Sequence, residues 1–436
     1  MTHGGSGRRT VGVEGLSRVE GEGSLRIEVR DGSVTDVSLS IFEPPRYFEA
    51  MLVGRRHTEA PDITARICGI CPVAYQMSAC AAVEDACGVE VGPRIRDLRR
   101  LLYCGEWIQS HALHVTLLHA PDFLGCADAV ELAERDRPSV ERALRLKQAG
   151  NLLMQTVGGR AVHPVNIRVG GFYKAPEPAV IGGLADRLRV ALDDALATVA
   201  WVSGFDVPDT EGDYRFVSLR EPGRYPVGSG RVVSSDGLDV TPAGFADLVV
   251  EEHLARSTAL HATLGGRDTY LTGPLARYSL NSASLPEVAR QAAASAGLGA
   301  TCTNPFRSIV VRSVELVFAC VEALRLIEAY EPPSPPSVAV PGVAATGVGA
   351  TEAPRGLLFH RYTLDDEGII RHAQIVPPTS QNQGTIEADL RRVAQESLAL
   401  DDEALTWRCE QTVRNHDPCI SCAAHFLDVT VDRRAP

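Results

Sequence analysis

The chain has 436 residues, 44% of them hydrophobic, and a formal net charge of −12. This length allows a large buried core, and the acidic balance excludes the basic groove of a nucleic-acid-binding protein. No run approaches the roughly 20 apolar residues of a membrane span. Arg8-Arg9 has no apolar segment behind it, so we expect no export signal.

Hydrophobic periodicity predicts a mainly α (α+β) protein, with a large helical core, small peripheral β-sheets and one domain over residues 1–436. In residues 24–42, apolar and polar residues alternate on both sides of a turn at Asp31-Gly32, and this predicts a hairpin within an N-terminal region 1–60. Residues 212–240 predict a small β insertion. Helices are expected at residues 72–87, 94–119, 139–157, 179–201, 284–296, 308–329, 385–398 and 402–413. Gly347-Val348-Gly349 is a partial glycine pattern of the kind found in nucleotide-binding loops, but no predicted strand precedes it, so we do not expect a nucleotide site there.

Eleven cysteines are an odd number for a disulfide framework. Seven stand singly in apolar or helical sequence, and we expect them to be small buried hydrophobic residues: Cys80, Cys87, Cys104, Cys126, Cys302, Cys320 and Cys409. This usage indicates a reducing compartment. We therefore predict a cytoplasmic protein.

The other four cysteines form two CxxC pairs. Segment 61–87 contains Cys68 and Cys71 directly before a predicted helix, and segment 414–425 contains Cys419 and Cys422. A helix N-terminus favours the thiolate, the form that binds metals. Two pairs supply four soft ligands for one site. From spacing alone, structural zinc, an iron–sulfur cluster and a catalytic nickel site remain open, although zinc ribbons rarely separate their pairs by about 350 residues.

The flanks of both pairs resemble the large subunit of nickel–iron hydrogenases. That family carries Arg-x-Cys-Gly-x-Cys near its N-terminus and Asp-Pro-Cys-x-x-Cys-x-x-His at its C-terminus, matched here by residues 66–71 and 417–425. Further family-like elements follow in the expected order: residues 17–21, 46–49, 158–171, 353–356 and 374–379. Tyr75 and Glu22 stand where many members have histidine, and both variants resemble the cytosolic, bidirectional, NAD(P)-linked class.

The resemblance implies a nickel–iron centre that cleaves and forms H2 heterolytically. Cys68 and Cys419 would bind nickel terminally, while Cys71 and Cys422 would bridge nickel to an iron that carries carbon monoxide and cyanide. The resemblance also implies that Glu20 is the first proton acceptor after the Cys419 thiolate, and that Arg355 lies over the metals with Asp122 and Asp417 as its hydrogen-bond partners. Pro378 and Thr379 would lie beside the cyanide. Glu49, the Ile375 carbonyl and His425 would surround a magnesium ion. The alternative for each is a structural role, such as an ion pair, a turn cap or a surface carboxylate. His111, His114 and His119 are expected to be core or surface residues rather than ligands.

Electrons need an exit that this chain does not itself provide. The resemblance therefore implies a small subunit with iron–sulfur clusters, and its class implies further diaphorase subunits with FAD and NAD(P). Most family members end near the histidine of the second motif after proteolysis, whereas residues 426–436 follow it here. The chain is then either a precursor for a maturation protease or a member that needs little trimming.

Two alternative functions remain at this point. A hydrogen-sensing regulatory hydrogenase would keep the same motifs. The quinone-site subunit of respiratory complex I resembles the family in fold, but that role does not require all four cysteines.

Overall fold

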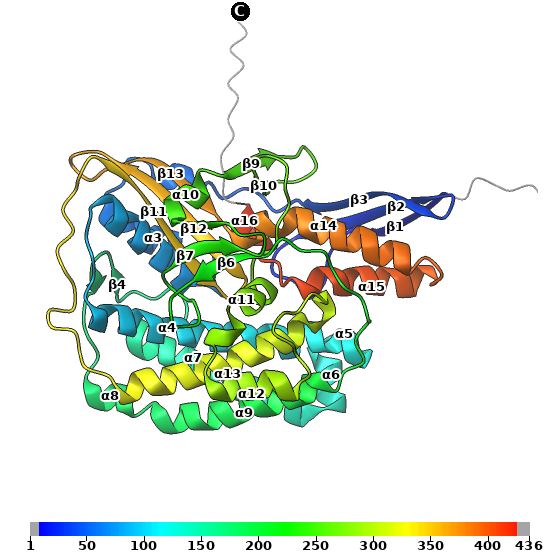
Figure 1. The fold of residues 1–436 in the computed structure, drawn as a ribbon, viewed down its shortest axis with the longest axis horizontal. Coiled ribbons are helices and arrows are strands. Elements are labelled where there is room, and N and C mark those ends of the chain that lie inside the picture. The colour runs from blue at the N-terminus through cyan, green and yellow to red at the C-terminus, as the bar shows by residue number, and fades with distance from the viewer. Residues whose placement is uncertain (1–7, 425–436) are drawn as a thin grey trace, which may run out of the picture.

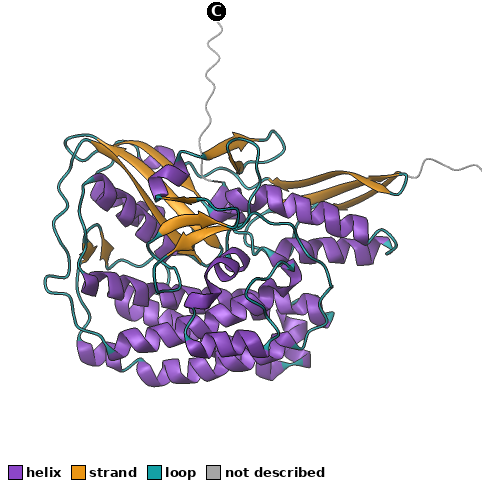
Figure 2. Ribbon diagram, in the orientation of Figure 1, coloured by secondary structure: helices purple, strands orange, loops and turns teal. Residues whose placement is uncertain are grey.

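The computed structural model describes residues 8–424. Figure 1 shows a layer of long helices along one side of the molecule and small antiparallel sheets along the other, and Figure 2 shows the same division by secondary structure. This arrangement confirms the predicted mainly helical α+β class. None of the helices within residues 8–424 is long and apolar enough to cross a membrane.

The helical layer is built on α4 (Pro93–Ala112), α7 (Arg137–Gly158), α9 (Ala185–Ser203) and α13 (Ser308–Glu328). α4 packs against α7 and α13, and α9 packs against α13. Two glycines let α4 and α7 approach closely, because a Cβ on Gly150 would lie 2.6 Å from the Gly105 carbonyl oxygen. α4 continues into a π-helical segment (Leu113–His119) and α5 (Ala120–Leu124).

A second unit joins the two ends of the chain. β1 (Arg8–Val13), β2 (Gly23–Arg30) and β3 (Ser33–Ile41) form an antiparallel sheet. α14 (Pro378–Glu396) packs on β3, and α15 (Asp402–Asn415) packs on β1 and α14. Buried residues alternate along β2, so one face of the sheet meets these helices. This packing brings the N-terminal segment to the short α16 (Ile420–Ala423).

The third unit is the sheet of β11 (Ala345–Ala353), β12 (Gly356–Leu364) and β13 (Ile370–Val376), which lies on α3 (Pro72–Ala86). Gly347 and Gly349 make this contact possible, because a Cβ on either would lie within 2.4 Å of the α3 backbone. The two glycines of the partial pattern therefore allow the sheet to pack closely on α3.

Shorter elements fill the remaining chain. The small strands are β4 (Ile167–Arg168), β5 (Gly171–Phe172), β6 (Val217–Arg220), β7 (Arg231–Ser234), β8 (Asp239–Val240), β9 (Val249–His253) and β10 (Leu260–Leu264). The short helices are α1 (Phe48–Leu52), α2 (Ala60–Thr64), α6 (Ala129–Arg135), α8 (Pro178–Gly182), α10 (Pro242–Ala246), α11 (Pro274–Asn281) and α12 (Glu287–Ser295). Single turns of 3-10 helix lie at His57–Glu59, Ser282–Ser284 and Pro305–Arg307.

Most predicted elements are present with shifted ends. The hairpin at residues 24–42 and the strands at 212–240 are confirmed, and β1 adds a strand that the sequence did not predict. The helix expected at 179–201 is divided at Gly183 into α8 and α9. The helix expected from residue 385 already begins at Pro378, so the strand before it ends at Val376.

Candidate metal centre

The two CxxC pairs meet in the core. Cys71 is the N-cap of α3 and Cys419 is the N-cap of α16, so each pair lies at a helix start. The Sγ atoms of Cys68 and Cys419 are 3.6 Å apart, and those of Cys71 and Cys422 are 3.9 Å apart. All four Sγ atoms lie within 4.8 Å of one another and are buried. The structure thus brings together the four cysteines that the sequence predicted.

The donor chemistry of this four-cysteine group suits a soft metal. The Cys68 Sγ accepts backbone N–H groups of Ile70 and Cys71, each at 3.3 Å. Hydrogen bonds from Cys419 and Cys422 hold the pKa of the Cys68 thiol well below its usual value, whereas burial raises the pKa of the Cys419 thiol. Because the four buried sulfurs compete for protons, a cation bound among them would stabilise their thiolate forms. Thiolates prefer nickel, iron or zinc.

Glu20 lies directly beside this group. Its Oε2 is 3.0 Å from the Cys419 Sγ and accepts the Ser421 N–H at 3.1 Å. Its carbonyl accepts the Ile420 N–H at 2.9 Å. The neighbouring Gly21 has φ 91, and a Cβ there would lie 2.7 Å from the Ile420 Cβ, so only glycine permits this approach. The Glu20 carboxylate therefore lies within hydrogen-bond distance of the Cys419 thiol.

Arg355 occupies the tip of the β11–β12 hairpin, where Ala353 pairs with Gly356. Its Nε donates to the Asp417 carbonyl at 2.9 Å, and one terminal nitrogen lies 3.2 Å from Asp417 Oδ1. Burial lowers the pKa of Arg355, but Asp417 and Cys419 raise it well above its usual value, so the side chain stays charged. Within residues 8–424, its other terminal nitrogen is buried without a hydrogen-bond partner, which fits a group bound beside it.

Asp122 does not have the expected partner. Its carboxylate accepts from Arg18 at 2.6 Å and from Arg414 at 2.7 and 2.8 Å. This buried cluster ties the N-terminal segment to α15. The expected hydrogen bond from Arg355 to the Asp122 carboxylate is therefore wrong, and of the two aspartates only Asp417 contacts that arginine in the described chain.

Pro378 and Thr379 begin α14 beside the second cysteine pair. Both are buried, and the Thr379 Oγ1 accepts the Cys419 N–H at 2.9 Å. This leaves the hydroxyl hydrogen of Thr379 able to donate elsewhere.

Two of the three expected magnesium ligands, Glu49 and Ile375, lie within the described residues. Glu49 Oε1 accepts the Ile375 N–H at 2.6 Å, so these two residues are adjacent. Burial raises the pKa of Glu49 to about 8, and nearby Glu251 adds to the rise. Burial also raises the pKa of Glu251 to about 7, and a motif-based interpretation had no reason to select this second carboxylate. His425 lies outside the described residues.

The three histidines are core residues, as expected. His111 Nε2 lies 2.9 Å from Glu315, His114 Nε2 lies 2.9 Å from the Arg414 carbonyl, and His119 Nε2 lies 2.9 Å from Asn415 Oδ1. Burial lowers the pKa of all three, so their rings are neutral.

Sequence reasoning also missed Glu106. This fully buried side chain on α4 accepts the N–H groups of Val73 at 2.6 Å and Ala74 at 3.1 Å. Those groups are the open N–H donors at the start of α3, directly after Cys71. Glu106 thus caps, from another helix, the turn that carries the first cysteine pair. A glutamate in a helix with several other charged residues gives no signal of such a distant partner.

The variant Glu106→Gln is expected to destabilise this turn. The glutamine NH2 would face a backbone N–H, leaving a buried donor unsatisfied, so the free energy of unfolding should fall by about 1–3 kcal/mol. Urea denaturation of the purified protein measures this. Exposed Glu90, replaced by glutamine, is the control and should change little. An unchanged midpoint in Glu106→Gln would contradict the capping role.

Comparison with known proteins gives a consistent result. The profile of the nickel-dependent hydrogenase family matches residues 46–142 and 317–425. Sulfhydrogenase 1 subunit alpha of Pyrococcus furiosus is 32% identical, over 96% of this chain and 98% of that protein. The beta subunit of the NAD-reducing hydrogenase HoxS of Cupriavidus necator is 28% identical, over 96% of this chain and 95% of that protein.

Solved structures share the whole fold. An NAD+-reducing nickel–iron hydrogenase in the H2-reduced state superimposes with a TM-score of 0.85 and 27% identity, over 97% of this chain and 100% of that one. A nickel–iron–selenium hydrogenase from Desulfomicrobium baculatum superimposes with a TM-score of 0.76 and 23% identity, over 96% and 100%. The hydrogenase interpretation of the motifs is confirmed. The chain belongs to the nickel-dependent hydrogenase family, as a catalytic large subunit of the nickel–iron type.

Proposed function

We propose that the four-cysteine group holds a nickel–iron centre at which H2 is reversibly cleaved. The observation that supports this most directly is the convergence of four buried sulfurs with Glu20 on one of them and Arg355 close by. In this assignment, Cys68 and Cys419 would hold nickel, and Cys71 and Cys422 would hold both nickel and an iron that carries carbon monoxide and cyanide. When bound, the metal pair polarises H2 for heterolytic cleavage.

The side chains around the centre would carry the proton away from Cys419 and hold a positive charge nearby. Cys419 Sγ and Glu20 Oε2 are 3.0 Å apart, so a proton on the thiol can pass to the carboxylate without rearrangement. Arg355 presents a permanent positive charge, and Asp417 fixes its orientation. We assign Thr379, with Pro378 beside it, to the cyanide, because its hydroxyl can still donate.

The second metal site we propose is magnesium, with Glu49, the Ile375 carbonyl and His425 as ligands. Its support is the contact between Glu49 and the Ile375 backbone. Carboxylate and carbonyl oxygens are the ligands that magnesium prefers. The raised pKa of Glu49 is the expected state of a buried carboxylate before a cation neutralises it.

Electrons released from H2 must leave through a partner. Among the described residues, the four cysteines form the one group of at least three side chains with metal-ligand spacing. We therefore propose a small subunit that carries iron–sulfur clusters. Similarity to the HoxS protein, named NAD-reducing, favours further diaphorase subunits with FAD and NAD(P). None of the eleven cysteines, which all lie within residues 8–424, forms a disulfide, and this supports a reducing cytoplasm. We also propose that residues 426–436 are the substrate of a maturation protease.

Infrared spectroscopy with metal analysis tests the centre. We expect bands in the carbon monoxide and cyanide region, with nickel and iron at about one each per chain. Zinc without such bands would contradict the proposal. H2-dependent reduction of NAD+ or NADP+ by the purified complex tests the electron acceptor. Reduction of an artificial dye alone would reject the NAD(P) link and favour a hydrogen-sensing role.

A further inference from the structure

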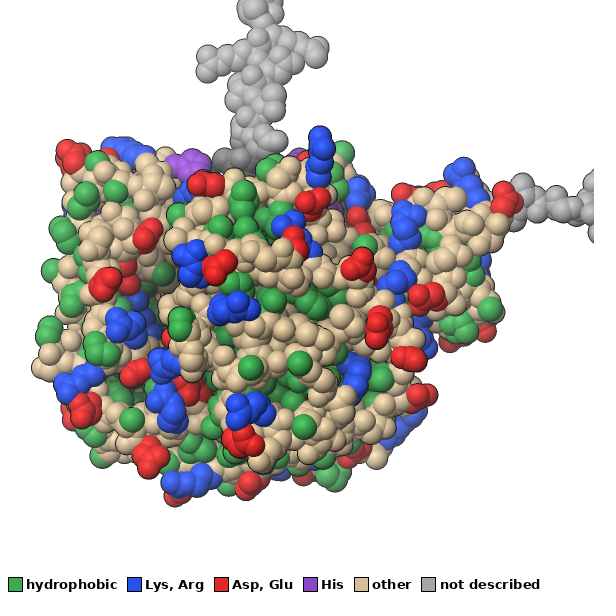
Figure 3. Space-filling view, viewed as in Figure 1, with side chains coloured by type: hydrophobic (Ala, Val, Ile, Leu, Met, Phe, Trp, Pro, Cys, Tyr) green, Lys and Arg blue, Asp and Glu red, His purple; other side chains and the backbone are tan. Residues whose placement is uncertain are grey.

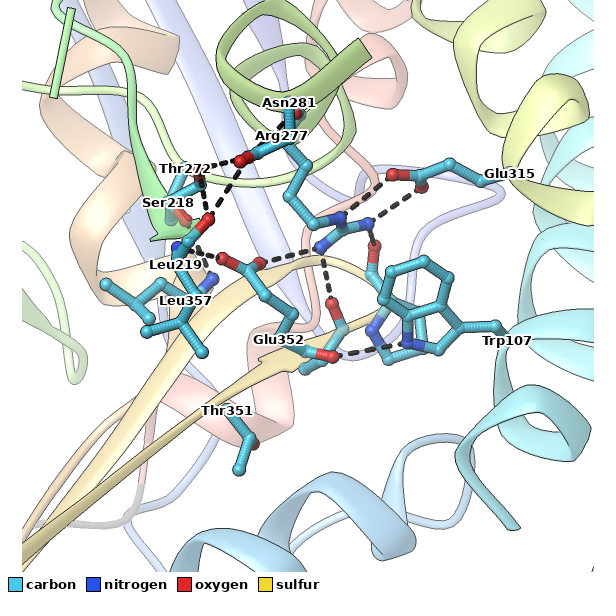
Figure 4. Close-up of polar contacts among 12 residues, drawn as sticks. Trp107, Ser218, Leu219, Thr272, Arg277, Asn281, Glu315, Thr351, Glu352 and Leu357 are labelled. Carbon is cyan, nitrogen blue, oxygen red and sulfur yellow. Dashed lines mark hydrogen bonds and ion pairs between the residues drawn. The ribbon is translucent and has the colours of Figure 1, made fainter. Parts of the chain in front are cut away.

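The tip of the β11–β12 hairpin is held by one buried arginine from another element. Arg277 lies on α11, and its side chain is fully buried. Figure 4 shows its guanidinium between Glu315 and Glu352, beside the Trp107 ring. The Arg277 Cζ lies 4.4 Å from the centre of that ring. The side chain therefore joins α4, α11, α13 and the hairpin at one point.

Every N–H group of this guanidinium has an acceptor. The Glu315 carboxylate accepts hydrogen bonds from Nε at 2.9 Å and from one terminal N–H at 2.8 Å, and the Glu352 carboxylate accepts one from another terminal N–H at 3.0 Å. The two remaining N–H groups bind the carbonyls of Ala353 at 2.7 Å and Pro354 at 2.8 Å. A guanidinium has five N–H donors in a fixed plane, so the positions of these acceptors are fixed relative to one another.

The two carbonyls belong to the residues directly before Arg355. The backbone after Arg355 is also held by the segment that leads into α11, because Leu357 N–H donates to Thr272 Oγ1 at 2.7 Å. At Gly273, which has φ 113, a Cβ would lie 2.6 Å from the Arg355 carbonyl oxygen. The start of α11 is thus in contact with the backbone on both sides of the catalytic arginine.

The charges favour a rigid arrangement. Burial raises the pKa of Glu315, but Arg277 outweighs this and holds it at about 2, so this ion pair persists at neutral pH. Burial raises the pKa of Glu352 to about 7 despite Arg277. Breaking a buried pair on one side leaves an uncompensated charge, which is strongly unfavourable. The hairpin tip therefore has little freedom to move away from Arg277.

We propose that Arg277 is a positioning residue for Arg355: by holding the Ala353 and Pro354 carbonyls, it sets where the Arg355 guanidinium lies relative to the four-cysteine group. This inference rests on the proposed role of Arg355 at the metal centre. Lysine keeps the charge of Arg277 but has only three donors and no planar fork. It cannot satisfy two carboxylates and two carbonyls in this geometry.

The test is Arg277→Lys in the complete, metal-loaded complex. Nickel and iron contents should stay near those of the wild type, because no cysteine is altered. A displaced Arg355 should lower kcat by roughly 10²-fold, as a misplacement of about 1 Å does, and shift the carbon monoxide and cyanide bands. The double variant with Arg355→Lys should lose little more than Arg355→Lys alone, because both changes act through one group.

The matched control is Arg99→Lys. Arg99 makes a similar two-point pair with Glu84, at 2.9 and 2.6 Å, which joins α4 to α3 rather than to the hairpin tip at Ala353–Gly356. This variant should lower the melting temperature without shifting the infrared bands or kcat. In the metal-free chain, amide hydrogen exchange of residues 352–358 should accelerate in Arg277→Lys and not in Arg99→Lys.

Unshifted bands, or losses in the double variant that simply multiply, would overturn the proposal and leave Arg277 a residue of general stability. If Arg277→Lys does not fold, Glu352→Gln is the milder variant, because it weakens one bond of the network. It should shift the bands in the same direction by less, and wild-type behaviour would also overturn the proposal. Absence of the bands in the wild type would instead reject the proposed metal centre, so the two failures are distinguishable.

Discussion

Cys422→Ser is expected to give a folded chain that holds neither nickel nor iron. Serine is nearly the same size as cysteine, but its hydroxyl is a hard ligand that does not ionise at neutral pH, whereas the proposed bridging position needs a soft thiolate. Cys422 Sγ lies 3.9 Å from Cys71 Sγ, so its loss opens the group on the bridging side. Metal analysis should show both contents falling from about one to background, and H2 oxidation should be undetectable.

Cys126→Ser is the matched control. Cys126 is equally buried, and its Sγ contacts only the Leu124 carbonyl at 3.7 Å among the described polar groups. This variant should keep its metals and its turnover. Melting temperatures of both variants separate a lost ligand from a lost fold. Normal nickel and iron in Cys422→Ser would show that the metal assignment is wrong.

The sequence predicted what short motifs carry. Cys68 and Cys71 are three positions apart at a helix start, and the same holds for Cys419 and Cys422, so local spacing already specifies paired ligands. The flanks of each pair supplied the resemblance that joined the two pairs into one site. Glu20 and Arg355 were found in the same way, from short family-like segments. Glu20 lies beside Cys419 and Arg355 bonds to Asp417, while the roles assigned to both residues stay predictions.

Features that depend on distant packing were not predictable in this way. β11 is buried along most of its length and carries two glycines, so it lacks the alternation that marks a strand with one exposed face. Glu106 and Arg277 are charged residues that are normally expected at the surface. Their partners lie on other elements, and only the fold shows that they are paired and buried.

Asp122 shows the limit of a loose resemblance. An aspartate near the end of a long helix was expected to contact Arg355, but Arg18 and Arg414 occupy its carboxylate. Charge pairing across the core depends on which arginine the packing brings close. Figure 3 shows acidic and basic side chains interspersed on the visible face, so the net charge of −12 does not by itself locate a partner surface.

Glu20→Gln is expected to separate metal binding from proton transfer. The glutamine carbonyl can still accept the Ser421 N–H, as Glu20 does at 3.1 Å, so the turn around Cys419 should keep its shape. The amide cannot take up a proton from the Cys419 thiol. Turnover should therefore fall by about 10²–10⁴-fold, the usual contribution of a general base, while nickel, iron and the infrared bands stay near wild type.

Exchange of D2 with water protons isolates this step, because it requires proton transfer and no electron acceptor. It should fall with turnover in Glu20→Gln. Glu43→Gln is the matched control, since Glu43, in the loop after β3, contacts the same turn by accepting a hydrogen bond from the Ser421 hydroxyl at 2.8 Å. This variant should exchange normally. Normal exchange in both variants would mean that the proton leaves Cys419 by a different group. Loss in both would assign the effect to the shape of the turn, because the two carboxylates share Ser421 and only Glu20 bonds to the cysteine.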